Sequence, residues 1–202
     1  MKKLLSLICA SCAVLTASSA FAQAQNFQGF GASLALNFVN TTSEVGWSKF
    51  GIRSKGSDTD VDYALQAQYN WALGNQFVLG LGASTTLGLL NAGTVTMRNA
   101  SFPIRIRESY ALFVEPGYAV SKDWLLYGKV AYVSAKIEAT GGGGSTNFAS
   151  GTGLGFGAQM LINKSWYGQA EWMVNQYDDR GSDTEIDKLK SNALSLGVGY
   201  KF

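Results

Sequence analysis

Apolar and polar residues alternate with a period of two along much of the chain, which is the pattern of β-strands with one face in apolar surroundings. The clearest example runs from Asp62 to Leu73, where every second residue from Tyr63 onward is apolar or aromatic. Segments of about ten residues match the 9 to 11 that a tilted strand needs to cross a membrane. Eight such segments occur, at 28–39, 62–73, 77–89, 109–118, 124–132, 153–162, 166–174 and 194–202.

The connections between these segments alternate in length. Short connections lie at 73–76, 121–123 and 163–165, and long polar ones at 40–61, 91–103, 137–151 and 176–190. Outer-membrane barrels have short periplasmic turns and longer extracellular loops. The pattern therefore predicts an all-β protein, an eight-stranded antiparallel up-and-down transmembrane β-barrel, with its short turns in the periplasm and its long loops extracellular.

Alternation does not say which face points outward, because a soluble barrel or sandwich alternates in the opposite sense. The polar face consists mostly of Gly, Ser, Ala, Gln and Asn, which suits a narrow lumen better than a water-exposed surface. The charged residues gather in the long connections and leave the apolar face almost uncharged, as a lipid-facing surface requires. Trp71, Trp124 and Trp166 lie beside the short turns, where an aromatic girdle is expected.

The amino terminus has the pattern of a secretory signal peptide. Lys2 and Lys3 precede an apolar run that ends near Ala17, and Ala20 and Ala22 form a small-x-small cleavage site. We expect residues 1–22 to be removed and residues 23–202 to form the barrel domain. Cleavage at a second small-x-small pattern, Ala22-Gln23-Ala24, is the alternative. An uncleaved anchor would need a longer apolar run.

Removal of the leader changes the charge and thiol counts. The 16 basic residues include two in the leader, so the remainder equals the 14 acidic residues, and the basic pI gives no indication of nucleic-acid binding. Both cysteines, Cys9 and Cys12, also lie in the leader. We therefore expect no disulfide, no thiolate-bound metal and no cofactor.

The stretch from Tyr110 to Tyr132 (YALFVEPGYAVSKDWLLYGKVAY) resembles the central hairpin of small OmpA/OmpX-type and opacity-type outer-membrane proteins, and the closing GVGYKF resembles their last strand. The resemblance implies a Gram-negative outer membrane, and it implies no peptidoglycan-binding domain, because the sequence stops at Phe202. It also implies a signal for the barrel assembly machinery, formed by Leu194, Leu196, Val198, Tyr200 and Phe202.

Three charged residues have the inward phase of the alternation: Glu115, Lys129 and Glu171. Reflection of the hairpin about Lys122 places Glu115 opposite Lys129, so the two should form an ion pair across the strands. We expect a mutually neutralising pair that blocks the lumen; an ion path is the alternative. Arg105 and Arg107 share this phase nearer the outer mouth, where they could join the network or line the rim.

Two long connections carry candidate binding residues. The first contains Trp47, Phe50 and Ile52 among its charges, which suggests a contact surface, with packing of the loop on itself as the alternative. The fourth is acidic and could bind divalent cations or approach those bound to lipopolysaccharide, although a solvated loop is the simpler interpretation; its acidic residues are Asp178, Asp179, Asp183, Glu185 and Asp187.

The sequence contains no histidine, and barrel enzymes of this kind resemble one another in using a catalytic one, so we expect no enzyme. Two functions stay open. The first is a structural or adhesin-like surface-interaction protein that meets a host or envelope ligand through its loops. The second is a narrow porin-like channel for small solutes. The expected partners are outer-membrane lipid, lipopolysaccharide and the assembly machinery, and we expect a monomer.

Overall fold

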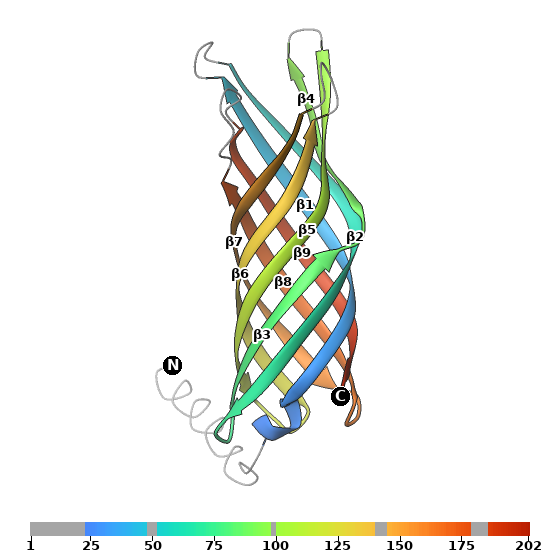
Figure 1. Cartoon of the computed structure of the whole chain (residues 1–202), viewed down its shortest axis with the longest axis vertical. Helices are drawn as coiled ribbons and strands as arrows, with labels where there is room; N and C mark the ends of the chain where they lie inside the picture. Colours follow the sequence, from blue (N-terminus) through green and yellow to red (C-terminus); the bar gives the residue numbers. More distant parts are fainter. Residues whose placement is uncertain (1–22, 48–51, 98–99, 140–144, 179–185) are drawn as a thin grey trace, which may run out of the picture.

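The computed structural model describes residues 23–47, 52–97, 100–139, 145–178 and 186–202, and it describes side chains within 23–42, 57–88, 108–136, 149–177 and 190–202. These ranges form one tilted, closed barrel (Figure 1). The elements are a 3-10 helix, η1 (Ala24–Phe27), and the strands β1 (Gly29–Trp47), β2 (Ile52–Leu73), β3 (Phe77–Thr86), β4 (Leu89–Met97), β5 (Ala100–Ala119), β6 (Trp124–Ala139), β7 (Ser145–Leu161), β8 (Trp166–Asp178) and β9 (Ile186–Lys201).

Every strand pairs antiparallel with its sequence neighbours except that β3 and β4 do not pair with each other, and β1 pairs with β9. The strands β3 and β4 both pair with β5 and together form one barrel strand, so the barrel has eight. The prediction of an eight-stranded antiparallel up-and-down barrel is confirmed. The interruption lies at Leu87 and Gly88, where any Cβ on Gly88 would collide with the buried carboxylate of Asp62.

The expected long loops are mostly strand. The β1 and β2 strands stay paired as far as Trp47 and Ile52, and the second and third long connections are shortened in the same way by the β4–β5 and β6–β7 pairing, whereas the β8–β9 pairing stops at Tyr177. The loops were predicted too long because these stretches contain fewer apolar residues, so the alternation that marks a lipid-facing strand weakens before the backbone pairing ends. The first three long connections are therefore largely strand hairpins.

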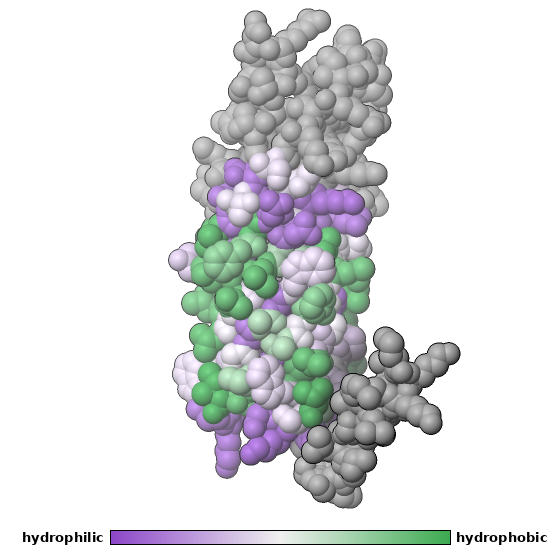
Figure 2. Space-filling view, turned by 180° about the vertical axis from the view of Figure 1, so that it is seen from behind, coloured by the Kyte–Doolittle hydropathy of each residue, from purple (hydrophilic) through white to green (hydrophobic). Residues whose placement is uncertain are grey.

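The outward face is apolar, as predicted. Leu112, Leu154 and Phe156 are each more than 60% exposed, and Figure 2 shows a green band of such side chains between two hydrophilic zones. Among the described residues, no helix is long and apolar enough to cross a membrane.

Aromatic rings gather near the short turns. Trp166 packs edge-on against Tyr200 with ring centroids 5.3 Å apart, and Phe77 packs against Tyr118 at the same distance. Amphipathic rings of this kind favour the boundary between lipid and water. Their position matches the girdle expected beside the short turns.

Candidate functional site

The lumen contains a buried ion cluster, defined here as Glu115, Lys129 and Glu171. The pairing of Gly117 with Tyr127 on β5 and β6 puts Glu115 and Lys129 opposite each other, as the reflection of the hairpin predicts. Lys129 Nζ lies 3.0 Å from Glu115 Oε1 and 2.7 Å from Glu171 Oε2, which comes from β8, two strands along the wall from β6. The three side chains therefore link β5, β6 and β8 through the lumen.

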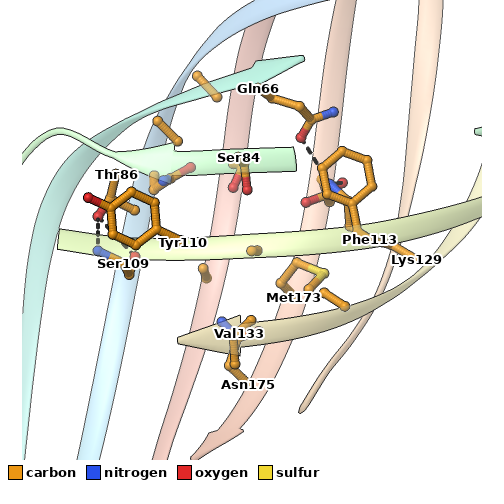
Figure 3. A pocket seen from close by; sticks show the side chains of 18 of the residues that line it. Gln66, Ser84, Thr86, Ser109, Tyr110, Phe113, Lys129, Val133, Met173 and Asn175 are labelled. Carbon is orange, nitrogen blue, oxygen red and sulfur yellow. Dashed lines mark hydrogen bonds and ion pairs between the residues drawn. The ribbon is translucent and has the colours of Figure 1, made fainter. Parts of the chain in front are cut away.

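Neutral groups complete the surroundings of the ammonium. Lys129 Nζ donates to Gln66 Oε1 at 3.0 Å and lies 4.1 Å from the centre of the Phe113 ring (Figure 3). The Tyr127 hydroxyl donates to Glu171 Oε2 at 3.1 Å. The ammonium thus has two hydrogen-bond acceptors, on Gln66 and Glu171, together with the Glu115 carboxylate as an ion-pair partner and an aromatic face, which is the kind of solvation that a buried cation requires.

The charge of the ion cluster differs from the neutral pair expected from the sequence. Two carboxylates share one ammonium, so the cluster carries a formal charge of −1 when all three groups are ionised. The extra carboxylate comes from a strand distant in sequence, and the two-strand reflection could not supply it. Its oxygen receives donors from both Lys129 and Tyr127, which offsets part of the repulsion.

Glycines on neighbouring strands make room for the large lumen side chains. Tyr127 pairs in register with Gly157, and a Cβ there would lie 2.5 Å from the Tyr127 ring. Tyr167 covers Gly199 and Phe113 covers Gly82 in the same manner. The inward glycines noted in the sequence are therefore specific partners of bulky side chains, in addition to narrowing the lumen.

A cavity of about 110 Å³ with a mixed polar and apolar lining lies beside the cluster, toward the strand hairpins. Gln66 and Lys129 border it at one end and Thr86 and Ser109 at the other (Figure 3), with the latter two hydroxyls 2.9 Å apart. A cavity of this size with such polar groups has room for a few water molecules. The described residues thus form a small chamber that ends at the cluster.

Several predicted residues fall where the structure gives less detail. The backbone of Arg105 pairs with Glu138 and that of Arg107 with Lys136, but both arginine side chains lie outside the described set, as do those of Trp47 and Ile52. The following residues lie outside the described ranges altogether: Ala20, Ala22, Phe50, Asp179, Asp183 and Glu185. Asp178 ends β8 and Asp187 lies in β9, and no cluster of metal-ligating side chains occurs in the part that was searched.

The five residues of the expected assembly signal lie on the outer face of β9 and at the chain end. Their exposed fractions range from 37% at Tyr200 to 74% at Phe202. The Phe202 amide donates to the Phe30 carbonyl oxygen at 2.9 Å. The signal residues therefore form an outward stripe at the junction of the first and last strands.

The sequence interpretation missed the helix η1. Ala24 and Phe27 are completely buried beside Val78, Ala119 and Leu125 at the short-turn end of the lumen. A four-residue helix has too little periodicity to be recognised, and the alternation begins only after it. The apolar inward residues of the three surrounding strands were the available signal.

Comparisons with solved structures give the same fold. The attachment invasion locus protein Ail of Yersinia pestis matches with a TM-score of 0.55 and 16% identity, covering 87% of this chain and 99% of that one. The Neisserial surface protein A (NspA) matches with a TM-score of 0.57 and 15% identity, covering 87% and 98%. No curated protein matches the sequence. The model of the outer membrane protein beta-barrel domain matches residues 10–202, and the chain belongs to that family.

Proposed function

We propose that this protein is a structural and surface-interaction protein of the outer membrane, closed to solutes and active through its strand hairpins. The observation that carries the proposal is the ion cluster. Its three side chains are 5–6% exposed and link β5, β6 and β8 through the lumen. A solute would have to break these contacts and leave charges unpaired in a low-dielectric interior, which is costly. This argues against the narrow channel, which is the alternative.

With the lumen closed, the strand hairpins are the part of the protein that is free to contact a partner. The β1–β2 hairpin continues nine residue pairs beyond Phe38 and Val61, so paired strands present its end. Trp47 and Ile52 pair at the end of these strands, and Phe50 lies between them in sequence, so this connection contains more apolar residues than a solvated loop needs. Apolar residues in a connection between paired strands favour contact with a ligand or partner surface.

The proposal also includes the export, the orientation, the assembly and the oligomeric state of the protein. Residues 1–22 direct export and are removed, the short turns face the periplasm, and the hairpins face outward toward lipopolysaccharide and host surfaces. The outward stripe ending in Phe202 is the assembly signal, and the barrel works as a monomer. The protein is not an enzyme: the absence of histidine removes the usual general base, and the buried carboxylates are committed to Lys129.

Conductance tests the closed lumen. The refolded protein is added to a planar bilayer under applied voltage, and we expect no discrete current steps. Reproducible steps from the unmodified protein would overturn the closed-lumen part and favour the channel.

Binding to a saccharide surface tests the hairpins. Ail has been solved in complex with the heparin analogue sucrose octasulfate, which makes heparin a suitable first probe. A variant in which Lys49, Arg53 and Lys55 of this connection are replaced by Ser should lose binding by at least about tenfold, because a sulfated saccharide is bound mainly by basic side chains. Lys122→Ser at the opposite end is the control. Equal binding by the two variants would contradict the assignment to this hairpin.

A further inference from the structure

The short-turn mouth of the barrel contains an apolar cluster, separate from the apolar cluster around Phe113 and Met173 deeper in the lumen. Val78, Ala119 and Leu125 point inward from β3, β5 and β6 and are at most 4% exposed. Phe27 and Ala24 complete this cluster, and neither is exposed at all. Burial of a phenylalanine side chain is strongly favourable in water, so this packing holds the helix in the mouth.

Polar contacts fix the same segment to three parts of the rim. The Ala24 amide donates to Asn75 O at 3.0 Å in the β2–β3 turn, and Asn26 Nδ2 donates to Lys122 O at 3.0 Å in the β5–β6 turn. Lys201 Nζ, at the end of β9, donates to Asn26 O at 2.6 Å. Figure 1 shows the helix, in blue, at the end of the barrel where these turns lie. The contacts are spread around the mouth.

We propose that residues 23–28 form an amino-terminal plug, a closure of the short-turn mouth that acts in series with the ion cluster. The inference rests on the proposed closed lumen and adds a second seal to it. The two seals differ in chemistry: the plug excludes water by apolar packing, and the cluster closes the lumen with paired charges. Because they act in series, removal of one leaves the other in place.

The plug and the ion cluster can each be disrupted by their own substitutions. Phe27→Asp puts a charge into the apolar mouth and should displace the plug, whereas Gln25→Asp changes an exposed position of the same helix and is the control. Glu115→Ala combined with Lys129→Ala removes the ion pair. A folded barrel migrates differently in a gel before and after heating, so a variant without this difference has not folded.

Single-channel conductance of these proteins and of the combined variant tests the inference. We expect discrete steps only when Phe27→Asp is combined with the two cluster substitutions. If the cluster variant alone gave steps as large as those of the combined variant, the plug would be overturned and the closed cluster would be kept. If Phe27→Asp alone gave steps as large as those of the combined variant, the closed cluster would be overturned and the plug would be kept. Silence from the folded combined variant would overturn the plug as the second seal.

Thiol labelling tests the same plug without opening the cluster. In a chain with Cys9→Ser and Cys12→Ser, a membrane-impermeant maleimide should modify Ala24→Cys about 10- to 100-fold more slowly than Gln25→Cys, because Ala24 is fully buried and the burial of Phe27 opposes opening. Lys201→Met should speed the labelling of Ala24→Cys, since the contact to Asn26 is lost. Equal labelling at the two positions would overturn the plug.

Discussion

Replacement of Lys129 by Met should destabilise the barrel by about 3–5 kcal/mol, the usual cost when one partner of a buried ion pair is removed. The ammonium donates to Glu171 and Gln66 and forms an ion pair with Glu115, and all three oxygens lie within 3.0 Å. Methionine fills a similar volume but donates to none of them. Two carboxylates then lie in the lumen without a counter-charge, and each unsatisfied acceptor adds about 1–3 kcal/mol.

The assay is equilibrium unfolding in urea, monitored by tryptophan fluorescence of the refolded barrel. Lys122→Met is the matched control, because the Lys122 side chain is 78% exposed and its Nζ lies 3.8 Å from Asp123 Oδ2. Exposed ion pairs of this kind contribute about 0–1 kcal/mol to the free energy of unfolding.

A compensated variant separates lost charge pairing from lost packing. Lys129→Met combined with Glu115→Gln and Glu171→Gln should return to within about 1 kcal/mol of the unmodified protein, because a buried ion network replaced by neutral groups is often as stable. A loss below about 1 kcal/mol for Lys129→Met alone, or no recovery in the compensated variant, would refute this account of the cluster.

Three further substitutions test other parts of the barrel. Gly157→Ala should cost about 1–3 kcal/mol in urea unfolding because its Cβ meets a tyrosine ring, whereas Gly128→Ala, with its nearest neighbour 4.0 Å away, should cost much less. Phe202→Ala should lower the amount of barrel recovered from outer membranes, whereas Phe156→Ala should not; equal amounts would contradict the assembly signal. Leu154→Arg places a charge on the lipid face and should destabilise the barrel by about 2–4 kcal/mol in a bilayer, with no change expected if that face were not in lipid.

The alternation was sufficient to predict the barrel and its two faces. A lipid-facing strand has to alternate, so the phase of each segment identifies inward residues such as Lys129 and Glu171, and both are buried in the lumen. The tight turn at residues 121–123 fixes the β5–β6 register, which is why Glu115 could be placed opposite Lys129. Local rules were enough wherever a contact joins adjacent strands.

Contacts around the barrel were beyond such rules. Glu171 reaches Lys129 from β8 because the wall curves, and the curvature depends on all eight strands at once. The burial of Phe27 likewise depends on three strands that meet only when the barrel closes. The extension of β1 to Trp47 was missed for another reason: backbone pairing continues there without an apolar face to mark it.

The ion cluster supplies a specificity that alternation cannot. A slip of one residue between β5 and β6 would turn inward residues toward lipid, so the apolar face alone opposes it. A slip of two residues between β5 and β6 keeps the apolar and polar faces, but it would bring Glu115 opposite Tyr127 or Ala131. Lys129 would then lose its cross-strand partner Glu115. The buried charges therefore penalise the slips that the hydrophobic pattern permits, as buried polar groups do when they fix a register. The compensated variant should then be stable but less uniform, with doubled backbone amide signals for β5 and β6 in nuclear magnetic resonance spectra; a single set of signals would show that the short turn fixes the register alone.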